Sequence, residues 1–109
     1  MPLDGGPQSF IPVTVPPRLL NAPELTRTMQ RLYPGALLNA GIGGTTTLWL
    51  RLDEDGRVIQ KRIKQSSGLP ALDEAALEVG GYARFSPAYN RDQRVPVWVE
   101  LPVVFVARD

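Results

Sequence analysis

The clearest pattern of apolar and polar positions lies between residues 94 and 105, near the end of the chain. Apolar side chains recur there at every second position, as they do in a β-strand that buries one face. The stretch therefore predicts a strand with a single apolar face, formed by Val95, Val97, Val99, Leu101, Val103 and Phe105.

Two prolines in this stretch, Pro96 and Pro102, have the opposite parity. Because backbone N–H groups of one parity point toward the same neighbouring strand, both prolines remove donors from one side only. Prolines occur in sheets mainly at edges, where no ladder hydrogen bond is lost. The open side keeps the N–H groups of Trp98, Glu100 and Val104, so this edge can accept a strand from another chain. The alternative is that the prolines only protect the edge against aggregation.

The region after residue 20 predicts a helix that ends in a glycine-rich break. Asn21 is a suitable N-cap, and Pro23 suits the first turn of a helix. Pro34 ends or kinks the helix because a residue before proline disfavours the α region. A short helical turn over residues 36–40 and a break at residues 41–44 follow. The apolar stripe of the helix consists of Leu25, Met29 and Leu32.

Residues 45–65 predict a β-hairpin. The first strand covers residues 45–53, and its apolar face consists of Leu48, Leu50 and Leu52. A tight turn over residues 53–56 ends at Gly56, which supplies a positive φ. The return strand, residues 57–65, is basic and carries Arg57, Lys61, Arg62 and Lys64.

A second helix is predicted to begin near Pro70, with Asp73 and Glu74 in its first turns. Its apolar stripe consists of Leu72, Ala75, Ala76, Val79 and Ala83. Pro87 prevents continuation of this helix, and residues 88–93 are predicted to form a polar connector into the final strand.

These elements predict an α+β domain with a three-stranded antiparallel sheet and two helices packed on one face. The hairpin makes the first two strands antiparallel, and the second helix returns the chain to the opposite end of the sheet. An all-antiparallel sheet then needs the strand order 2-1-3, which leaves the basic return strand and the final strand at the two edges. Lysine and arginine deter pairing at an edge, so the final strand is the expected docking edge.

The first part of the chain is predicted to be a separate, extended lead-in. Residues 1–23 hold six of the eleven prolines and are interpreted as a linker, followed by a domain over residues 24–109. An alternative interpretation is that the apolar residues of the lead-in pair with an exposed edge as a short strand; these are Phe10, Ile11, Val13 and Val15.

Composition excludes several classes of function. The chain has 109 residues, a net charge of +1, no cysteine and no histidine. The near-neutral charge gives no bulk attraction to nucleic acid. The lack of histidine and cysteine removes the usual general base and the thiolate ligands of metals, so no catalytic residue, metal site or cofactor is predicted. No apolar run approaches the length of a membrane helix, so any membrane anchor is expected outside this sequence.

Short motifs throughout the last two thirds of the chain resemble the C-terminal domain of the TonB family of energy transducers. The resemblance covers about residues 30 to 106, and its specificity comes from the order and spacing of the motifs. They are Tyr33-Pro34, Gly41-Ile-Gly-Gly44, Asp55-Gly56-Arg57-Val58, Ser66-Ser67-Gly68, Leu72-Asp73-Glu74-Ala75-Ala76, Phe85-Ser-Pro-Ala88 and Val95-Pro-Val-Trp-Val-Glu-Leu-Pro102.

The resemblance implies a periplasmic domain that binds the TonB box of a TonB-dependent outer-membrane receptor by strand addition. It implies coupling to the proton-driven ExbB and ExbD proteins through an inner-membrane segment that this sequence does not contain. A glutamine three residues before the Tyr-Pro pair contacts the box region in the family, which carries that role to Gln30. The predicted partner-binding residues are Gln30, Tyr33, Pro34, Val97, Trp98, Val99, Glu100 and Leu101.

Two further hypotheses stay open from the sequence. The same edge could serve a structural or interaction module without energy transduction, by pairing with a second copy in a homodimer or with the lead-in. Alternatively, the basic return strand could bind a cell-wall glycan or another polyanion.

Overall fold

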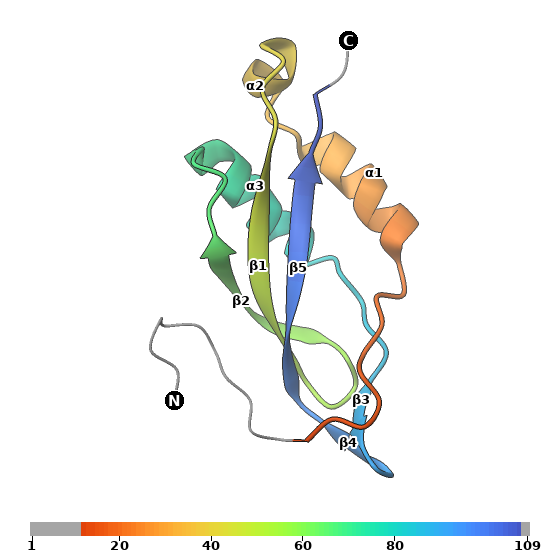
Figure 1. Ribbon diagram of the computed structural model, residues 1–109. Helices are drawn as coiled ribbons and strands as arrows, with labels where there is room; N and C mark the ends of the chain where they lie inside the picture. The colour runs from red at the N-terminus through yellow and green to blue at the C-terminus, as the bar shows by residue number, and fades with distance from the viewer. Residues whose placement is uncertain (1–11, 108–109) are drawn as a thin grey trace.

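The computed structural model describes residues 12–107, and a three-stranded antiparallel sheet forms its centre (Figure 1). The strands are β1 (Gly44–Leu52), β2 (Val58–Gln65) and β5 (Val97–Phe105). Their order is β2-β1-β5, with both pairs antiparallel. This confirms the predicted order 2-1-3 and places the final strand at an edge of this sheet.

The hydrophobic core lies between this sheet and two helices, α1 (Ala22–Leu32) and α3 (Pro70–Gly80). β1 alternates as predicted, with Leu48, Leu50 and Leu52 fully buried beneath the helices. The predicted stripe of the second helix is buried as well: Leu72, Ala75, Ala76, Val79 and Ala83. Ala83 contributes from just beyond the helix, because α3 ends at Gly80.

Gly80 allows the end of α3 to approach β1 closely. A Cβ on Gly80 would stand 2.8 Å from the Leu48 Cδ1 atom and 3.3 Å from the Leu50 Cδ2 atom. The first distance is shorter than real Cβ contacts and the second is tight, so a side chain here would force the leucines to shift. Glycine costs helix propensity at this position but permits the packing of the core.

The predicted helical turn is α2 (Gly35–Asn39), and the loop after it is held by Tyr33. The Tyr33 hydroxyl donates a hydrogen bond of 2.6 Å to the Ile42 carbonyl oxygen. A Cβ on Gly43 would stand 2.2 Å from the Phe105 carbonyl oxygen and 3.2 Å from the Tyr33 hydroxyl oxygen. The Tyr-Pro and glycine-rich motifs are therefore one packing unit, because the tyrosine and the end of β5 leave no space for a side chain at Gly43.

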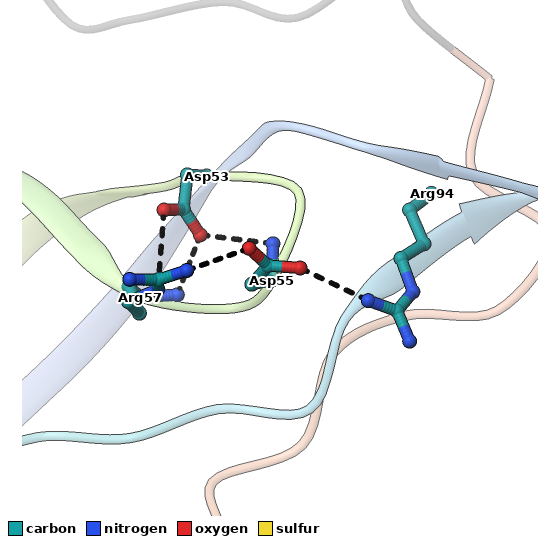
Figure 2. Close-up of polar contacts among 4 residues, drawn as sticks. All are labelled: Asp53, Asp55, Arg57 and Arg94. Carbon is teal, nitrogen blue, oxygen red and sulfur yellow. Dashed lines mark hydrogen bonds and ion pairs between the residues drawn. The ribbon is translucent and has the colours of Figure 1, made fainter.

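The tip of the β1–β2 hairpin is joined to the rest of the domain by Asp55 (Figure 2). Its carboxylate accepts hydrogen bonds from Arg57 at 2.8 Å and from Arg94 at 2.9 Å. The hydrogen bond from Arg57, together with the positive charges of both arginines, lowers the pKa of Asp55. Gly56 has the predicted positive φ, 85°, and is packed against the Phe85 carbonyl group.

Two short strands that the sequence analysis did not predict precede β5. They are β3 (Ala88–Asn90) and β4 (Gln93–Val95), and they form a separate two-stranded sheet. The expectation of a polar connector over residues 88–93 was therefore wrong. The predicted long final strand is also divided, since Val95 pairs with Ala88 in β4 and Pro96 separates it from β5. The chain changes its pairing partner at Pro96, from β3 before this residue to β1 after it.

The lead-in contacts the domain along residues 82–89 over its described part. The Val15 and Tyr89 backbones pair, and the Leu20 N–H donates to the Arg84 carbonyl oxygen at 2.8 Å. The Asn21 side chain completes this contact by donating to the Tyr82 carbonyl oxygen at 2.9 Å and accepting from the Arg84 N–H at 3.0 Å. Val15 therefore pairs with Tyr89 of β3, while Phe10 and Ile11 lie outside the described residues. The division of the chain at residue 23 stays a prediction.

A polar cluster around Asp73 joins α3 to both β1 and the end of β2. The Asp73 carboxylate accepts hydrogen bonds from the Thr46 hydroxyl at 2.7 Å, from the Ser67 N–H at 2.9 Å, and from the hydroxyls of Ser66 and Ser67. Partial burial raises the pKa of Asp73, but these hydrogen bonds outweigh it and lower the pKa to about 2. Ser66 and Ser67 thus have a structural role in a motif that the sequence presented only as a turn.

Candidate functional site: the free edge of the sheet

β5 has an unpaired edge along its length, because β1 is its only neighbour in the three-stranded sheet of the described residues. The Phe105 carbonyl oxygen points at β1, since it lies 2.2 Å from where a Cβ on Gly43 would stand. Backbone groups alternate along a strand, and the β1–β5 register has no irregularity. The N–H groups of Trp98, Glu100 and Val104 therefore point away from β1, and Pro102 removes no bond to β1.

Helix α1 lies beside this edge, on the side of β5 away from β1 (Figure 1). Its core stripe includes Leu25 and Thr28, which are buried, and Met29 and Leu32, which are partly buried. Next to this stripe is a second one with the same helical spacing of i, i+3, i+4 and i+7. It consists of Thr26, Met29, Gln30 and Tyr33, the last of which directly follows the helix.

A cavity of about 210 Å³ separates this second stripe from the end of β5. The Tyr33 ring meets the Phe105 ring edge-on, with ring centroids 5.1 Å apart, and holds the end of α1 against the strand. The seven residues that line the cavity carry no charge; they are Thr26, Met29, Gln30, Tyr33, Val104, Phe105 and Val106. We call this cavity the α1–β5 cleft.

The predicted partner-binding residues fall into two groups. Gln30 and Tyr33 line the α1–β5 cleft, at the carboxyl end of β5. Pro34 is half-buried at the start of α2 and does not line the cleft. The others lie in the first half of β5, where Val97, Val99 and Leu101 face the core and Trp98 and Glu100 lie on the other face of the sheet.

The predicted partner-binding residues did not include five of the seven residues that line the cleft: Thr26, Met29, Val104, Phe105 and Val106. A signal was present, because Thr26 and Met29 share the helical spacing of Gln30 and Tyr33. Val104 and Val106, at the other wall, are 45% and 57% exposed. Only the packing of α1 against β5 shows that these residues share a cavity.

The face of the sheet without helices carries a network of aromatic and charged side chains. The guanidinium groups of Arg51 and Arg62 lie 5.8 and 6.0 Å from the centre of the Trp98 ring. The Lys64 ammonium lies 5.1 Å from the centre of the Trp49 ring and 2.7 Å from a Glu100 carboxylate oxygen. The cations of β2 thus reach across β1 toward β5, and the Glu100 charge is already paired.

The described residues contain no group of three or more acidic, histidine or cysteine side chains arranged for a metal ion. Within the same residues, none of the helices has the length and apolar character needed to cross a membrane. The feature that stands out in the described residues is an unpaired strand edge with an uncharged cleft beside it, an arrangement of the kind that can accept an added strand.

Comparison with known families identifies this arrangement. The family described as "Gram-negative bacterial TonB protein C-terminal" matches residues 29–107. The chain belongs to this family, the C-terminal domains of TonB energy transducers. The match includes α1 from Met29 onward and every strand of the sheet, so it covers all residues of the α1–β5 cleft except Thr26.

Curated relatives agree with this assignment. The chain is 33% identical over 94 residues to "Protein TonB" of Vibrio cholerae, covering 85% of this chain and 38% of that protein. It is 32% identical over 73 residues to "Protein tonB2" of Pseudomonas aeruginosa, covering 67% of this chain and 27% of that protein. The chain thus spans well under half the length of these relatives.

A solved structure is similar in fold. The solution structure of the Helicobacter pylori TonB C-terminal domain superposes with a TM-score of 0.53 at 20% identity, covering 79% of this chain and 83% of that one. At this identity the likeness shows a shared fold, and the sheet with helices on one face agrees with the α+β class that the sequence predicts.

Proposed function

We propose that this domain binds the TonB box of a TonB-dependent outer-membrane receptor, which adds as a fourth strand to the free edge of β5. The observation that carries the proposal is the unpaired edge of β5, which has a regular register with β1 and outward N–H groups at Trp98, Glu100 and Val104. Backbone hydrogen bonds supply the affinity in this mode of recognition.

The proposed role is mechanical and not enzymatic. Each backbone hydrogen bond contributes only about 0.5–1.5 kcal/mol net, but several such bonds in a row share a load applied along the strand. A joint of modest affinity can therefore transmit a pull from this domain to the receptor. Transmission from an inner-membrane motor of the ExbB and ExbD type, and a location in the periplasm, belong to this proposal and require a membrane segment elsewhere in the protein.

The partner-binding residues follow from this arrangement. The guest forms ladder hydrogen bonds beside Trp98 and Glu100, with Val97, Val99 and Leu101 holding this part of β5 on the core. Gln30 and Tyr33 contact the guest where it passes the α1–β5 cleft, and Pro34 fixes the chain direction after Tyr33.

A proline at Glu100 tests the proposal. Glu100→Pro removes one outward N–H without removing a bond to β1, so the domain is expected to stay folded and to lose binding of a synthetic TonB box peptide by about tenfold or more. Binding is measured by fluorescence anisotropy, and folding by circular dichroism and amide NMR spectra. Glu100→Gln is the matched control, since it removes the ion pair with Lys64 and keeps the N–H.

A second control addresses the other edge. The backbone N–H and C=O groups of Trp49 and Arg51 point toward β2, where their partners are Arg62 and Gln60. Because these groups alternate along a strand, the N–H of Ile63 points away from the sheet. Ile63→Pro is therefore expected to leave peptide binding unchanged. Unchanged binding by a folded Glu100→Pro variant would contradict docking at β5, and a loss of binding in Ile63→Pro alone would move the site to β2.

A further inference from the structure

A fourth strand added beside β5 would be covered by protein on only one of its two faces. Neighbouring strands lie about 4.8 Å apart, so an added strand would lie just beyond β5, over the part of α1 that extends past this edge (Figure 1). The stripe of Thr26, Met29, Gln30 and Tyr33 lines the cleft on that side. A guest strand would therefore have helix α1 beneath one of its faces.

The α1–β5 cleft has the size and character of a site for one or two side chains. Its volume of about 210 Å³ is below the roughly 300–1,000 Å³ of small-molecule sites. Its walls carry no charged group, and Met29 and Phe105 give them an apolar surface on the α1 side. An aliphatic side chain would be buried there, whereas a carboxylate or ammonium group would lose its hydration without a partner.

The opposite face of the guest position has no such wall. On this face β5 presents Trp98, Glu100, Pro102 and Val104, and the Trp98 ring already lies under Arg51 and Arg62. The Glu100 carboxylate is paired with Lys64 at 2.7 Å, so it does not require a positively charged side chain on the guest. Guest side chains on this face would remain in water.

We infer that the guest is an extended segment chosen by the side chains of one parity only, with uncharged apolar residues at the alternate positions that face α1. This inference rests on the proposed strand addition and names the chemistry of its partner. Successive side chains of a strand point to opposite faces, whichever direction the guest runs, so the requirement has a period of two.

The two groups of site residues also set a minimum length for the guest. The first outward N–H of β5 is that of Trp98, whereas the cleft lies at Val104 to Val106. A guest that uses both must span at least the seven positions from 98 to 104. Pro102 interrupts the donors between them, so the ladder and the cleft are two separate contacts of one peptide.

An aspartate scan of a bound peptide tests the inference. Each residue of the TonB box peptide is replaced singly by aspartate, and affinity for the whole chain is measured by fluorescence anisotropy. At positions that pass the cleft, we expect losses of about tenfold or more at alternate residues and less than about twofold at those between. Losses that are uniform, or that follow no period of two, would overturn the inference.

A charge-complementary variant assigns the sensitive face to α1. Thr26 is exposed, and a lysine there would bring an ammonium group to the cleft. Thr26→Lys is expected to restore at least about fivefold of the affinity lost by an aspartate peptide at a sensitive position, whereas Thr26→Gln, the uncharged control, restores none. A periodic scan that Thr26→Lys does not rescue would place the selecting surface elsewhere and overturn the inference.

The outcomes separate the inference from the proposed function. If no TonB box peptide binds the unaltered chain, the proposed strand addition itself fails. If peptides bind and Glu100→Pro abolishes binding, but the scan shows no alternation, only the selection by α1 fails. If a second copy of this chain occupies the edge, sedimentation shows a dimer that the peptide does not displace, and both fail.

Discussion

The two edges of the same three-stranded sheet are built in opposite ways. The β2 edge is irregular, with register shifts near both ends of its pairing with β1, and it carries Lys61, Arg62 and Lys64. The β5 edge is regular over all nine residues, and no cation lies between Val95 and Val106. Bulges and lysines deter strand addition, so one edge is protected and the other is left usable.

The two edges also differ in how the helices hold them. The β2 side is joined to α3 by the Asp73 cluster and by the Lys61 chain, which packs near Gly80 and Gly81. The β5 side meets α1 through Tyr33 and Phe105, and the α1–β5 cleft remains beside this contact. The difference shows how a small domain can be rigid on one side of its sheet and open on the other.

The largest expected effect comes from a proline at a position of β5 whose N–H points at β1. Val99→Pro removes an N–H that points at β1 and leaves a buried carbonyl group without its donor. We expect a loss of about 2–3 kcal/mol in the free energy of unfolding, or about 10–20 °C in Tm. Differential scanning calorimetry of Val99→Pro and Glu100→Pro makes the comparison, and similar Tm values for the two variants would refute the assigned parity.

The next effect sharpens the contrast between the two helix contacts. Asp73→Asn removes the charge that four hydrogen bonds stabilise, so we expect about 1–2 kcal/mol of destabilisation, or about 5–10 °C in Tm. Peptide affinity is expected to stay within about twofold below the Tm, because the Asp73 cluster lies on the β2 side. A tenfold loss of affinity in the folded variant would show that the two sides are coupled.

The same cluster predicts how stability depends on pH. The pKa of Asp73 is about 2 in the folded chain and 3.8 in the reference state, so its contribution is fully present above about pH 4. It is lost as the pH falls through this window toward 2, where the carboxyl group protonates in both states. Urea denaturation between pH 2 and 5 should show a steeper loss in the unaltered chain than in Asp73→Asn, and parallel curves would argue against the lowered pKa.

The smallest effect tests the protection of the β2 edge. In an antiparallel pairing of two β2 edges, the lysines of two copies would repel each other at a cost of roughly 0.2–1 kcal/mol per pair. Lys61→Val is therefore expected to strengthen weak self-association by about fivefold, measured by sedimentation velocity over a series of concentrations. Arg27→Val, which removes a cation from the exposed surface of α1, serves as the control and should leave self-association unchanged.

Much of this protein follows from its sequence alone. The alternation of Leu48, Leu50 and Leu52 and of the apolar residues in β5 predicts which faces are buried, because a strand has a period of two. The prolines at 96 and 102, just before and within β5, identify this strand as an edge, since their missing donors would cost ladder bonds at the centre of a sheet. The few residues that separate β1 from β2 along the sequence predict the hairpin, and the strand order follows from it.

Only the tertiary structure decided where the elements meet one another. Pro96 divides the predicted final strand, and its first part pairs with Ala88 in a ribbon that the polar residues 88–93 did not indicate. The lead-in pairs with Tyr89 through an isolated bridge, which has no period that a sequence could display. The α1–β5 cleft arises because Tyr33 and Phe105 hold α1 beside the edge of β5. Local patterns determine which face of an element is buried, whereas the contacts between distant elements depend on the packing of the whole core.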